Sequence, residues 1–362
     1  MSSVDMDAVS TLLDLMAIES HESVEVIREH LVDVVPGAAV DPSGCVVARR
    51  GDPAEGPHIV LNSHMDVVPP HIAPAQDGDI ITGRGACDAK GCLTPMLSAF
   101  AATDPSAGCI ELVISPDEET VNLGLAEYLA DGHPADLAII GEPTGLDLCP
   151  SARGHFDIEI GFTGRAAHGG TPESGLNATV CAAAAVQRIM ALEPMMDETV
   201  GPNSATPTII NAGERANQVP DSATLVVDYR PIPGETEESV QERVAEALAA
   251  SACPVTVDMY PSGARLGPFK TSHDHRYVRA MQQTAAAVRD EPVAVHSFPA
   301  ATEAAFFDPL MPTIVFGPGQ IADGETPIAH SKDEYVRASS VQTAAKILEA
   351  FLEEMVVDAA VA

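Results

Sequence analysis

Acidic and imidazole side chains recur directly after short apolar segments of this sequence. Two imidazoles and several carboxylates are ligands that a pair of divalent metal ions can share, and one further carboxylate can act as a general base. These residue types therefore predict metal-assisted hydrolysis. In chain order the residues are His64, Asp66, Asp88, Asp117, Glu118, Glu119, Glu142 and His330.

Two of these positions can be interpreted from local geometry. His64 and Asp66 are two residues apart, so an extended backbone places them on one face, where Asp66 can orient the imidazole of a metal ligand. Asp88 lies in GRGACDAKG (83–91), whose glycines permit tight turns around an ion. Taken singly, a solvated strand end and an ordinary turn aspartate remain as alternatives.

The other candidate residues are ambiguous when they are considered one at a time. Glu118 and Glu119 are adjacent, so in extended backbone their side chains diverge, and one can hold a metal while the other is a base. An acidic surface loop is the competing interpretation. Glu142 precedes Pro143, which restricts its backbone, and His330 is one of twelve histidines. Only their joint occurrence points to a metal centre.

Alternating strands and helices are expected to position these residues. Apolar segments that end in polar residues, with helical segments between them, are typical of a mostly parallel central sheet flanked by helices. Ligands of such sheets gather at the carboxyl ends of the strands. Ser339 and Gln342 indicate a capping box for the terminal helix. The expected strands are 58–64, 109–115, 136–142 and 312–319, and the expected helices are 4–31, 92–102 and 123–130.

A second module is expected to interrupt this domain. Its predicted elements follow the order β-α-β-β-α-β, which is the ferredoxin-like α+β pattern. The chain is therefore expected to form a discontinuous catalytic domain, 1–154 and 263–362, and an inserted lid domain, 155–262. The expected strands of the insert are 156–164, 205–213, 223–231 and 253–260, and its expected helices are 177–192 and 237–250.

The composition limits the partners and the location of the protein. With 53 Asp and Glu against 19 Lys and Arg, the chain carries a formal charge of −34, which disfavours nucleic acid and anionic membranes as partners. Only four of the basic residues are lysines, a pattern similar to cytoplasmic proteins of salt-loving organisms, so folding should weaken at low salt. Seven cysteines without CxxC pairs, and no membrane-spanning apolar run, indicate free thiols in a reducing cytoplasm.

Together these motifs resemble a known enzyme family. The chain is similar to the acetylornithine deacetylase and succinyl-diaminopimelate desuccinylase group of co-catalytic zinc metallopeptidases, from His64 to Tyr335. The matching motifs, in order, are GRGACDAKG (83–91), DEE (117–119), GEPT (141–144), ATEAAF (301–306), GPGQ (317–320) and HSKDEY (330–335), and the last three are most similar to acetylornithine deacetylases.

The resemblance implies a role for each candidate residue of the first domain. Two divalent metal ions are expected, with zinc favoured and cobalt or manganese as alternatives. Asp66 would tune the His64 site, and Glu118 would be the general base for a water that bridges the ions. The implied ligands are His64 and Glu142 for one ion, Glu119 and His330 for the other, and Asp88 for both.

Further roles are implied for the insert and for the rim of the pocket. His168, in GRAAHGGTP (164–172), would reach across a homodimer formed by the lid and steady an oxyanion. A loop histidine, and surface salt bridges for the arginines, are the alternatives. The implied substrate contacts are Arg153, Asn217 and Arg230 near the substrate carboxylate, and Thr302 and Gly317 in the pocket.

The resemblance thus implies an amidohydrolase that removes an acetyl or succinyl group from an amino acid such as ornithine or diaminopimelate. A dipeptidase or carboxypeptidase of the same family is one alternative, and a non-hydrolytic metal-binding regulatory protein is another. The chain has no tryptophan, which many relatives carry after the Asp66 motif, and its segment IADGETPIA (321–329) is longer than theirs. Both differences flank the pocket, so the acyl group and the amino acid stay open.

Overall fold

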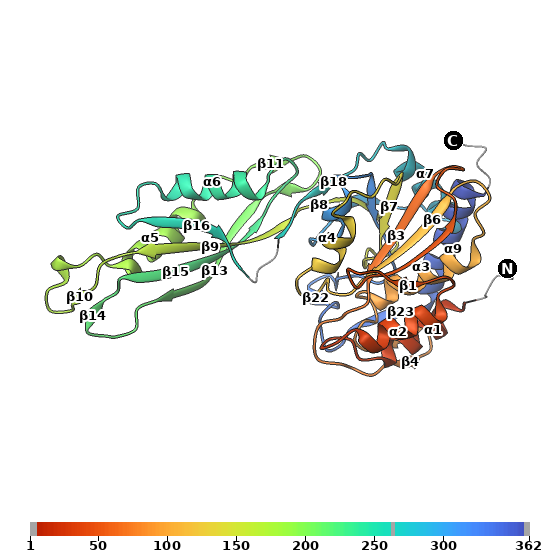
Figure 1. The fold of residues 1–362 in the computed structure, drawn as a ribbon, viewed down its shortest axis with the longest axis horizontal. Helices are drawn as coiled ribbons and strands as arrows, with labels where there is room; N and C mark the ends of the chain where they lie inside the picture. The colour runs from red at the N-terminus through yellow and green to blue at the C-terminus, as the bar shows by residue number, and fades with distance from the viewer. Residues whose placement is uncertain (1–5, 262–264, 358–362) are drawn as a thin grey trace. The chain divides into compact units, whose positions relative to one another are not determined.

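The computed structural model describes residues 6–261 and 265–357. The chain forms two compact units, each with its own hydrophobic core (Figure 1). The first unit spans Met1–Ser151, Lys270–Phe298 and Thr302–Ala362, and the second spans Ala152–Phe269 and Pro299–Ala301.

A mixed sheet forms the centre of the first unit. Its strands follow the order β1-β2-β6-β3-β7-β20-β8-β18, with β19 beside β8. Neighbours from β6 to β20 are parallel, whereas β2 on β6 and β8 on β20 are antiparallel, so the predicted parallel sheet is confirmed at its centre and is mixed toward its edges. The strands are β1 (Ala39–Val40), β2 (Val46–Gly51), β3 (His58–His64), β6 (Cys109–Ser115), β7 (Leu137–Ile140), β8 (Leu148–Ala152), β18 (Phe269–Lys270), β19 (Val295–Phe298) and β20 (Thr313–Val315).

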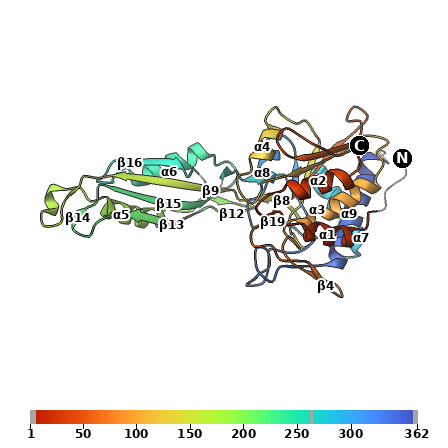
Figure 2. The same cartoon turned by 60° about the horizontal axis from the view of Figure 1, so that its bottom comes forward.

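Helices flank this sheet. α3 packs against α9, with α1 and α7 beside them, whereas α4 packs on α8, which contacts β7 and β20 (Figure 2). The described helices lack the combination of length and apolar character that crossing a membrane requires. The helices of this unit are α1 (Ala8–Ala17), α2 (Glu25–Val34), α3 (Lys90–Ala102), α4 (Leu123–Leu129), α7 (Arg276–Arg289), α8 (Ala304–Phe307) and α9 (Ala338–Val356).

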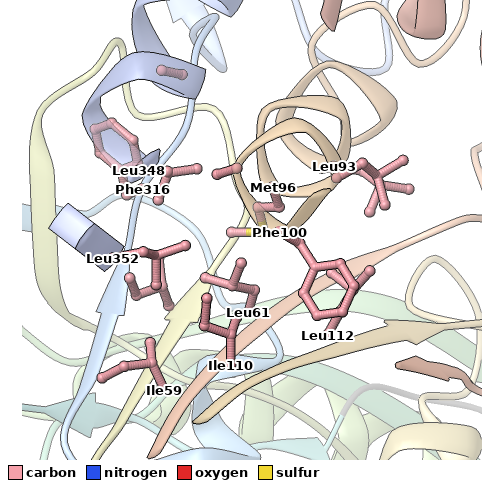
Figure 3. Close-up of a cluster of buried hydrophobic side chains, with 14 of the residues drawn as sticks. Ile59, Leu61, Leu93, Met96, Phe100, Ile110, Leu112, Phe316, Leu348 and Leu352 are labelled. Carbon is pink, nitrogen blue, oxygen red and sulfur yellow. The ribbon is translucent and has the colours of Figure 1, made fainter. Parts of the chain in front are cut away.

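The core of the first unit explains why the central strands are apolar throughout. Every residue of β3 and β6 is buried, because both faces of these strands are covered. Figure 3 shows Leu61 and Leu112 of the sheet against Phe100 of α3, with Leu352 of α9 nearby. Each fully buried side chain of this size contributes roughly 1.5–3 kcal/mol through the hydrophobic effect. This rigid layer fixes the strand ends that carry the candidate ligands.

Two helix predictions need correction. A single helix was expected over residues 4–31, but the chain forms two helices there, α1 and α2. Val4 itself lies outside the described residues. The buried ammonium of Lys90 donates to the carbonyl oxygens of Leu15 (3.0 Å) and Ile18 (2.7 Å) and so satisfies the carbonyls where α1 ends. Such a long-range contact cannot be seen in a local apolar pattern.

The predicted capping box at Ser339 and Gln342 is also wrong. The N-cap of α9 is Arg337, without a side-chain cap. The backbone N–H and the hydroxyl of Ser339 both donate to the carboxylate of Asp79, each at 2.8 Å. A carboxylate 260 residues away in the sequence therefore replaces the local cap at the positive end of the helix.

The second unit confirms the ferredoxin-like pattern. Its sheet runs β13-β15-β9-β16 with antiparallel neighbours, and α5 and α6 pack on it. Residues of β9 alternate between buried and partly exposed positions, as expected for a sheet covered on one face. The elements are β9 (His155–Thr163), α5 (Ala178–Met190), β13 (Ser204–Ala212), β15 (Ser222–Arg230), α6 (Glu237–Leu248), β16 (Val255–Met259) and β17 (Arg265–Leu266).

Short strands complete both units. A three-stranded sheet, β23-β5-β4, lies in the first unit, and a two-stranded ladder, β10-β14, lies in the second. The bounds are β4 (Ala75–Asp77), β5 (Ile80–Thr82), β10 (Ala167–His168), β11 (Met196–Asp197), β12 (Gly201–Pro202), β14 (Gln218–Val219), β21 (Ala322–Asp323), β22 (Thr326–Pro327) and β23 (Tyr335–Arg337), and a 3₁₀ turn covers Pro172–Ser174.

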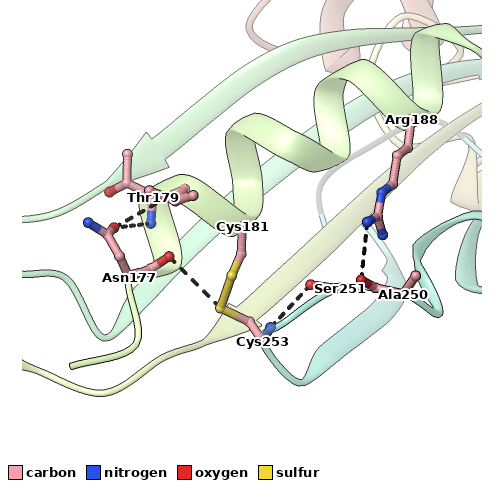
Figure 4. Close-up of a disulfide and its surroundings, with 8 residues drawn as sticks. Asn177, Thr179, Cys181, Arg188, Ala250, Ser251 and Cys253 are labelled. Carbon is pink, nitrogen blue, oxygen red and sulfur yellow. Dashed lines mark hydrogen bonds between the residues drawn. A yellow bond between two sulfur atoms is a disulfide. The ribbon is translucent and has the colours of Figure 1, made fainter. Parts of the chain in front are cut away.

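The prediction that all cysteines are free thiols is wrong for one pair. Cys181 of α5 and Cys253, which precedes β16, form a disulfide with their Cα atoms 6.1 Å apart (Figure 4). The fold brings together two residues that are 72 positions apart in the sequence. Sequence spacing alone gives no sign of this proximity, because it depends on how α5 packs beside the start of β16.

A buried ionic cluster lies at the other end of the central strands. Glu111 of β6 is 2% exposed, and its Oε2 lies 2.8 Å from Nε2 of both His58 and His133. Its Oε1 accepts hydrogen bonds from the Tyr128 hydroxyl at 2.5 Å and the Arg49 guanidinium at 3.0 Å. We call these five residues the Glu111 cluster.

The geometry of the Glu111 cluster makes His58 a cation. Nδ1 of His58 lies 3.1 Å from the carbonyl oxygen of Pro134, which can only accept a hydrogen bond, and Nε2 faces the carboxylate of Glu111. His58 therefore donates from both ring nitrogens. Burial alone would lower the pKa of His58, but hydrogen bonds with Cys109 and Glu111 raise it to about 9.

The stability of the fold should therefore fall at alkaline pH. Because the pKa of His58 is about 9 in the folded state and 6.5 ordinarily, its contribution is complete below pH 6.5 and is lost as pH rises through 9. Urea unfolding at pH 6.5 and pH 10 should show this loss, on the order of 2 kcal/mol, in the wild type and a smaller loss in Glu111→Gln. Asp104→Asn, which removes an exposed partner of Arg50, is the control. Equal pH dependence in wild type and Glu111→Gln would contradict the assignment.

Candidate metal centre

The ends of three parallel strands bring the candidate ligands together. His64 is the last residue of β3 and lies opposite Ser115, the last residue of β6, in the parallel register. Glu118 follows β6 after a short turn, and Glu142 follows β7, which pairs with β3 on its other side. The carboxyl ends of these strands thus meet at one edge of the sheet, as the sequence predicted.

Asp88 lies between the two imidazoles. Its Oδ1 is 3.3 Å from Nε2 of His64, and its Oδ2 is 3.2 Å from Nε2 of His330. His330 comes from a segment more than 240 residues away and adopts a left-handed backbone conformation, with φ of 61°. The two oxygens of Asp88 therefore face in two directions, which suits a carboxylate shared by two cations.

Two overlapping ligand sets share Asp88. Ligand atoms of His64, Asp88 and Glu142 lie within 4.8 Å of one another, and so do those of Asp88, Glu119 and His330. Oε1 of Glu119 is 3.0 Å from Nε2 of His330. In the first set His64 and Glu142 are buried and the side chain of Asp88 is 13% exposed, whereas the side chain of His330 in the second set is 51% exposed. The structure therefore brings together all five residues predicted as ligands.

Asp66 contacts both the imidazole of His64 and the acidic turn at Glu118 and Glu119. Its oxygens accept hydrogen bonds from the backbone N–H groups of Glu118 at 3.1 Å and Glu119 at 3.0 Å. Its Oδ1 also lies 3.2 Å from Nδ1 of His64. The backbone at Glu118 is a turn and not extended, so the side chains of Glu118 and Glu119 do not diverge, and each places an atom within 4.8 Å of a ring nitrogen of His64. Asp66 thus fixes the orientation of the imidazole and of the acidic turn.

Thr302 and Gly317 both lie against Glu142. The hydroxyl of Thr302, which is 1% exposed, donates to Oε1 of Glu142 at 3.3 Å. A Cβ at Gly317 would meet the carbonyl oxygen of Glu142 at 2.6 Å, so only glycine allows this close approach. Both residues thus support a candidate ligand from behind.

The charge balance of the centre fits divalent cations. Burial raises the pKa of Glu118 and Glu142 well above the ordinary value, and neighbouring carboxylates add to this effect. Hydrogen bonds to Asp88 and Glu119 raise the pKa of His330 to about 10. Nε2 of His64 is buried, and although Oδ1 of Asp88 lies 3.3 Å away, the two atoms are not aligned for a hydrogen bond. Cations would compensate these carboxylates and bind this nitrogen, so the residues fit two divalent metal ions.

Several neighbours of the centre were missed by the sequence analysis. Arg84 and Glu334 form a buried ion pair at 2.6 Å between the segments of Asp88 and His330. Glu303 is buried, accepts a hydrogen bond from Ser115 at 2.8 Å, and has its pKa raised to about 7 by burial. Each lies inside or beside a motif that was recognised. Their charge and their position beside predicted ligands could have marked them as neighbours of the centre. Their hydrogen-bond partners could not be found in this way, because these partners are distant in the sequence.

The other candidate residues belong to the second unit, where two of them lie side by side. His168 of β10 is exposed, and the backbone N–H of Gly169 donates to the carbonyl oxygen of Asn217 at 2.8 Å. Nδ1 of His168 accepts a hydrogen bond from the Gly170 N–H at 3.0 Å, so the neutral ring carries its proton on Nε2. The structure thus presents His168 as a hydrogen-bond donor.

The two arginines of this unit already have partners. Nε and Nη2 of Arg230 donate to the two carboxylate oxygens of Asp228, each at 2.8 Å. Arg153 donates to the carbonyl oxygen of Pro202 at 3.2 Å. An anionic substrate would therefore compete with Asp228 for Arg230. A salt bridge of this kind was the alternative interpretation of Arg230 from the sequence.

Similarities to known proteins agree with this geometry. A family model described as peptidase family M20/M25/M40 matches residues 60–354. A protein of Pyrobaculum aerophilum, named as a LysW-lysine/LysW-ornithine hydrolase, is 28% identical over 97% of this chain and 98% of its own length. An acetylornithine deacetylase of Yersinia pestis is 28% identical over 80% of this chain and 77% of its own length.

Solved structures share the fold. A tripeptidase from Staphylococcus aureus has a TM-score of 0.78 and 19% identity, covering 98% of this chain and 99% of its own. A dinuclear metal-binding peptidase from Bacillus subtilis has a TM-score of 0.72 and 14% identity, covering 96% of this chain and 97% of its own. At these identities the likeness establishes the architecture alone.

Proposed function

The chain belongs to the peptidase family M20/M25/M40, and from this premise we propose that it is a metal-dependent amidohydrolase that removes an acyl group from the amino group of an amino acid. Acetyl or succinyl is the proposed acyl group, and ornithine or diaminopimelate represents the proposed class of amino acid. The observation that carries this proposal is the carboxylate of Asp88 shared between two imidazole- and carboxylate-containing ligand sets, with Glu118 beside them. Zinc is the proposed metal, and cobalt or manganese would suit the same ligands.

The residues of the centre suit hydrolysis of an amide. When bound, the two cations would supply Lewis-acid chemistry that polarises the amide carbonyl and acidifies water. Glu118 lies within 4.8 Å of the ligand atoms of His64 and Glu119, so its carboxylate is placed beside the ligands and can act as a general base. We assign Glu118 to take a proton from water and deliver it to the leaving amine.

The second unit would complete the site in a homodimer. His168 carries a donor on Nε2 that would stabilise a developing oxyanion, reaching the centre of the partner subunit. The edge strand β13 supports dimerisation, because Ile209 and Ile210 on it are 44% and 49% exposed. Asn217, Arg153 and Arg230 are proposed to bind the substrate carboxylate, which Arg230 can receive only by exchanging Asp228.

A peptidase is the nearest alternative. The tripeptidase named above shares the fold, and its substrate also contains an amide bond beside a carboxylate. Thr302 and Gly317 support Glu142 in the structure and do not by themselves decide between the two substrate classes. A non-hydrolytic regulatory protein is the alternative from another class, and the basic group at Glu118 disfavours it. The low lysine content and high charge favour a high-salt cytoplasm as the proposed location.

A substrate panel tests the proposed function. The purified protein is assayed at molar potassium chloride with added zinc or cobalt on N-acetylornithine, N-succinyl-diaminopimelate, other N-acyl amino acids, dipeptides and tripeptides. We expect the highest kcat/KM on an N-acyl amino acid. Higher values on peptides would establish the peptidase alternative, and two bound metals without any hydrolysis would favour the regulatory one.

A further inference from the structure

We propose that the buried ion pair of Arg84 and Glu334 is a positioning device that holds Asp88 and His330 in register, and so sets the affinity for the ion bound by Asp88, Glu119 and His330. This inference rests on the proposed two-metal function. It assigns a role to two residues that contact no reacting atom. Their segments are 250 positions apart in the sequence and meet only in the folded chain.

The ion pair lies at the end of a short strand ladder. β5 and β23 pair antiparallel, with Thr82 opposite Tyr335, and the backbone N–H of Gly83 donates to the carbonyl oxygen of Glu334 at 3.1 Å. Directly beyond this bond, Nη1 of Arg84 lies 2.6 Å from Oε2 of Glu334. The side chains are 2% and 1% exposed, so solvent does not screen the pair. The Arg84–Glu334 contact thus extends the pairing of β5 and β23 toward Asp88 and His330.

Each side chain of the pair also forms hydrogen bonds with backbone groups of the segment that carries the other. Oε1 of Glu334 accepts hydrogen bonds from the backbone N–H groups of Cys87 at 3.0 Å and Asp88 at 3.2 Å. Arg84 donates to the carbonyl oxygens of Ser331 at 3.2 Å and His330 at 3.5 Å. The backbone of both ligands is therefore fixed by the same pair, with no contact through bulk solvent.

The two ligand sets should depend on this pair to different degrees. His64 and Glu142 follow the buried strands β3 and β7, which hold them without the pair. His330 follows only the two-residue strand β22, is half exposed, and has a left-handed backbone that needs support from its surroundings. An apolar pair of similar volume would suit stability at least as well as a buried ion pair. Compared with an apolar pair, the charged pair therefore contributes the hydrogen bonds that align the segments of Asp88 and His330.

Metal titration of Glu334→Gln tests the inference. Zinc affinity is measured at molar potassium chloride by competition with a chromophoric chelator, on metal-free wild type and variant. We expect one of the two zinc equivalents to bind 10- to 100-fold more weakly in the variant, and the other, which shares Asp88 but keeps His64 and Glu142, to weaken by a clearly smaller factor. Turnover at saturating zinc should return to near the wild-type value, because both side chains are buried and neither is a proposed ligand, base or substrate contact.

Glu111→Gln is the matched control, because it also removes a buried carboxylate paired with an arginine, at the opposite end of the strands. It should lower stability and leave both zinc affinities unchanged. Arg84→Lys retains the charge but loses the planar guanidinium group that makes several hydrogen bonds. It is the second test variant, and it should show the same selective weakening if Glu334→Gln does not fold. Unchanged affinities in the folded variants, or equal weakening in the control, would overturn the inference. A wild type that binds fewer than two zinc ions would instead overturn the proposed function and the inference with it.

Discussion

Replacement of Glu118 with glutamine is expected to lower kcat on the best substrate by about 100- to 10,000-fold, the range by which a positioned general base contributes. The amide matches the size of the carboxylate but cannot take the proton. The five proposed ligands are left intact, so the variant should still bind two metal ions. Steady-state kinetics with metal analysis of the same sample checks both parts of this prediction.

Asp117→Asn is the matched control for Glu118→Gln. Asp117 is the neighbouring acid of the same turn, but its carboxylate accepts from the backbone N–H groups of Leu123 at 2.8 Å and Gly124 at 3.1 Å, at the start of α4. Its replacement should lower stability and change kcat by only a few-fold. If Glu118→Gln kept full turnover, the base would have to be another group.

Removal of the metal ions is expected to abolish hydrolysis completely. Without cations, the carboxylates of Asp88, Glu118, Glu119 and Glu142 face only two imidazoles. Their mutual repulsion in a buried site should also lower the melting temperature of the metal-free protein. Chelation, followed by assay and a thermal melt at molar potassium chloride, measures both effects.

Readdition provides the control for the chelation experiment. Zinc or cobalt should restore both turnover and melting temperature, and two equivalents should suffice. Calcium at the same concentration should restore neither, because the centre offers imidazole nitrogen as well as oxygen. Hydrolysis that persists in protein shown to be metal-free would refute the metal-dependent mechanism.

Much of the architecture could be predicted because its cause is local. β3 and β6 have the predicted bounds, since continuous apolar segments with polar ends form strands buried on both faces. The alternating pattern of β9 and the element order of the insert gave the ferredoxin-like module. The convergence of His64, Glu118 and Glu142 followed from parallel strands that end at one edge. His330, by contrast, could be joined to them only through the family resemblance.

What the sequence by itself determined is therefore the set of elements, the parallel centre of the sheet and the residue types of a two-cation centre, because apolar periodicity and residue chemistry are written locally. Only the tertiary structure decided the contact of Lys90 with the carbonyls at the end of α1, the Asp79 cap of α9, the Cys181–Cys253 disulfide and the Arg84–Glu334 pair. In each case the partners are more than 70 residues apart in the sequence. Their contact depends on three-dimensional packing, which no local pattern encodes.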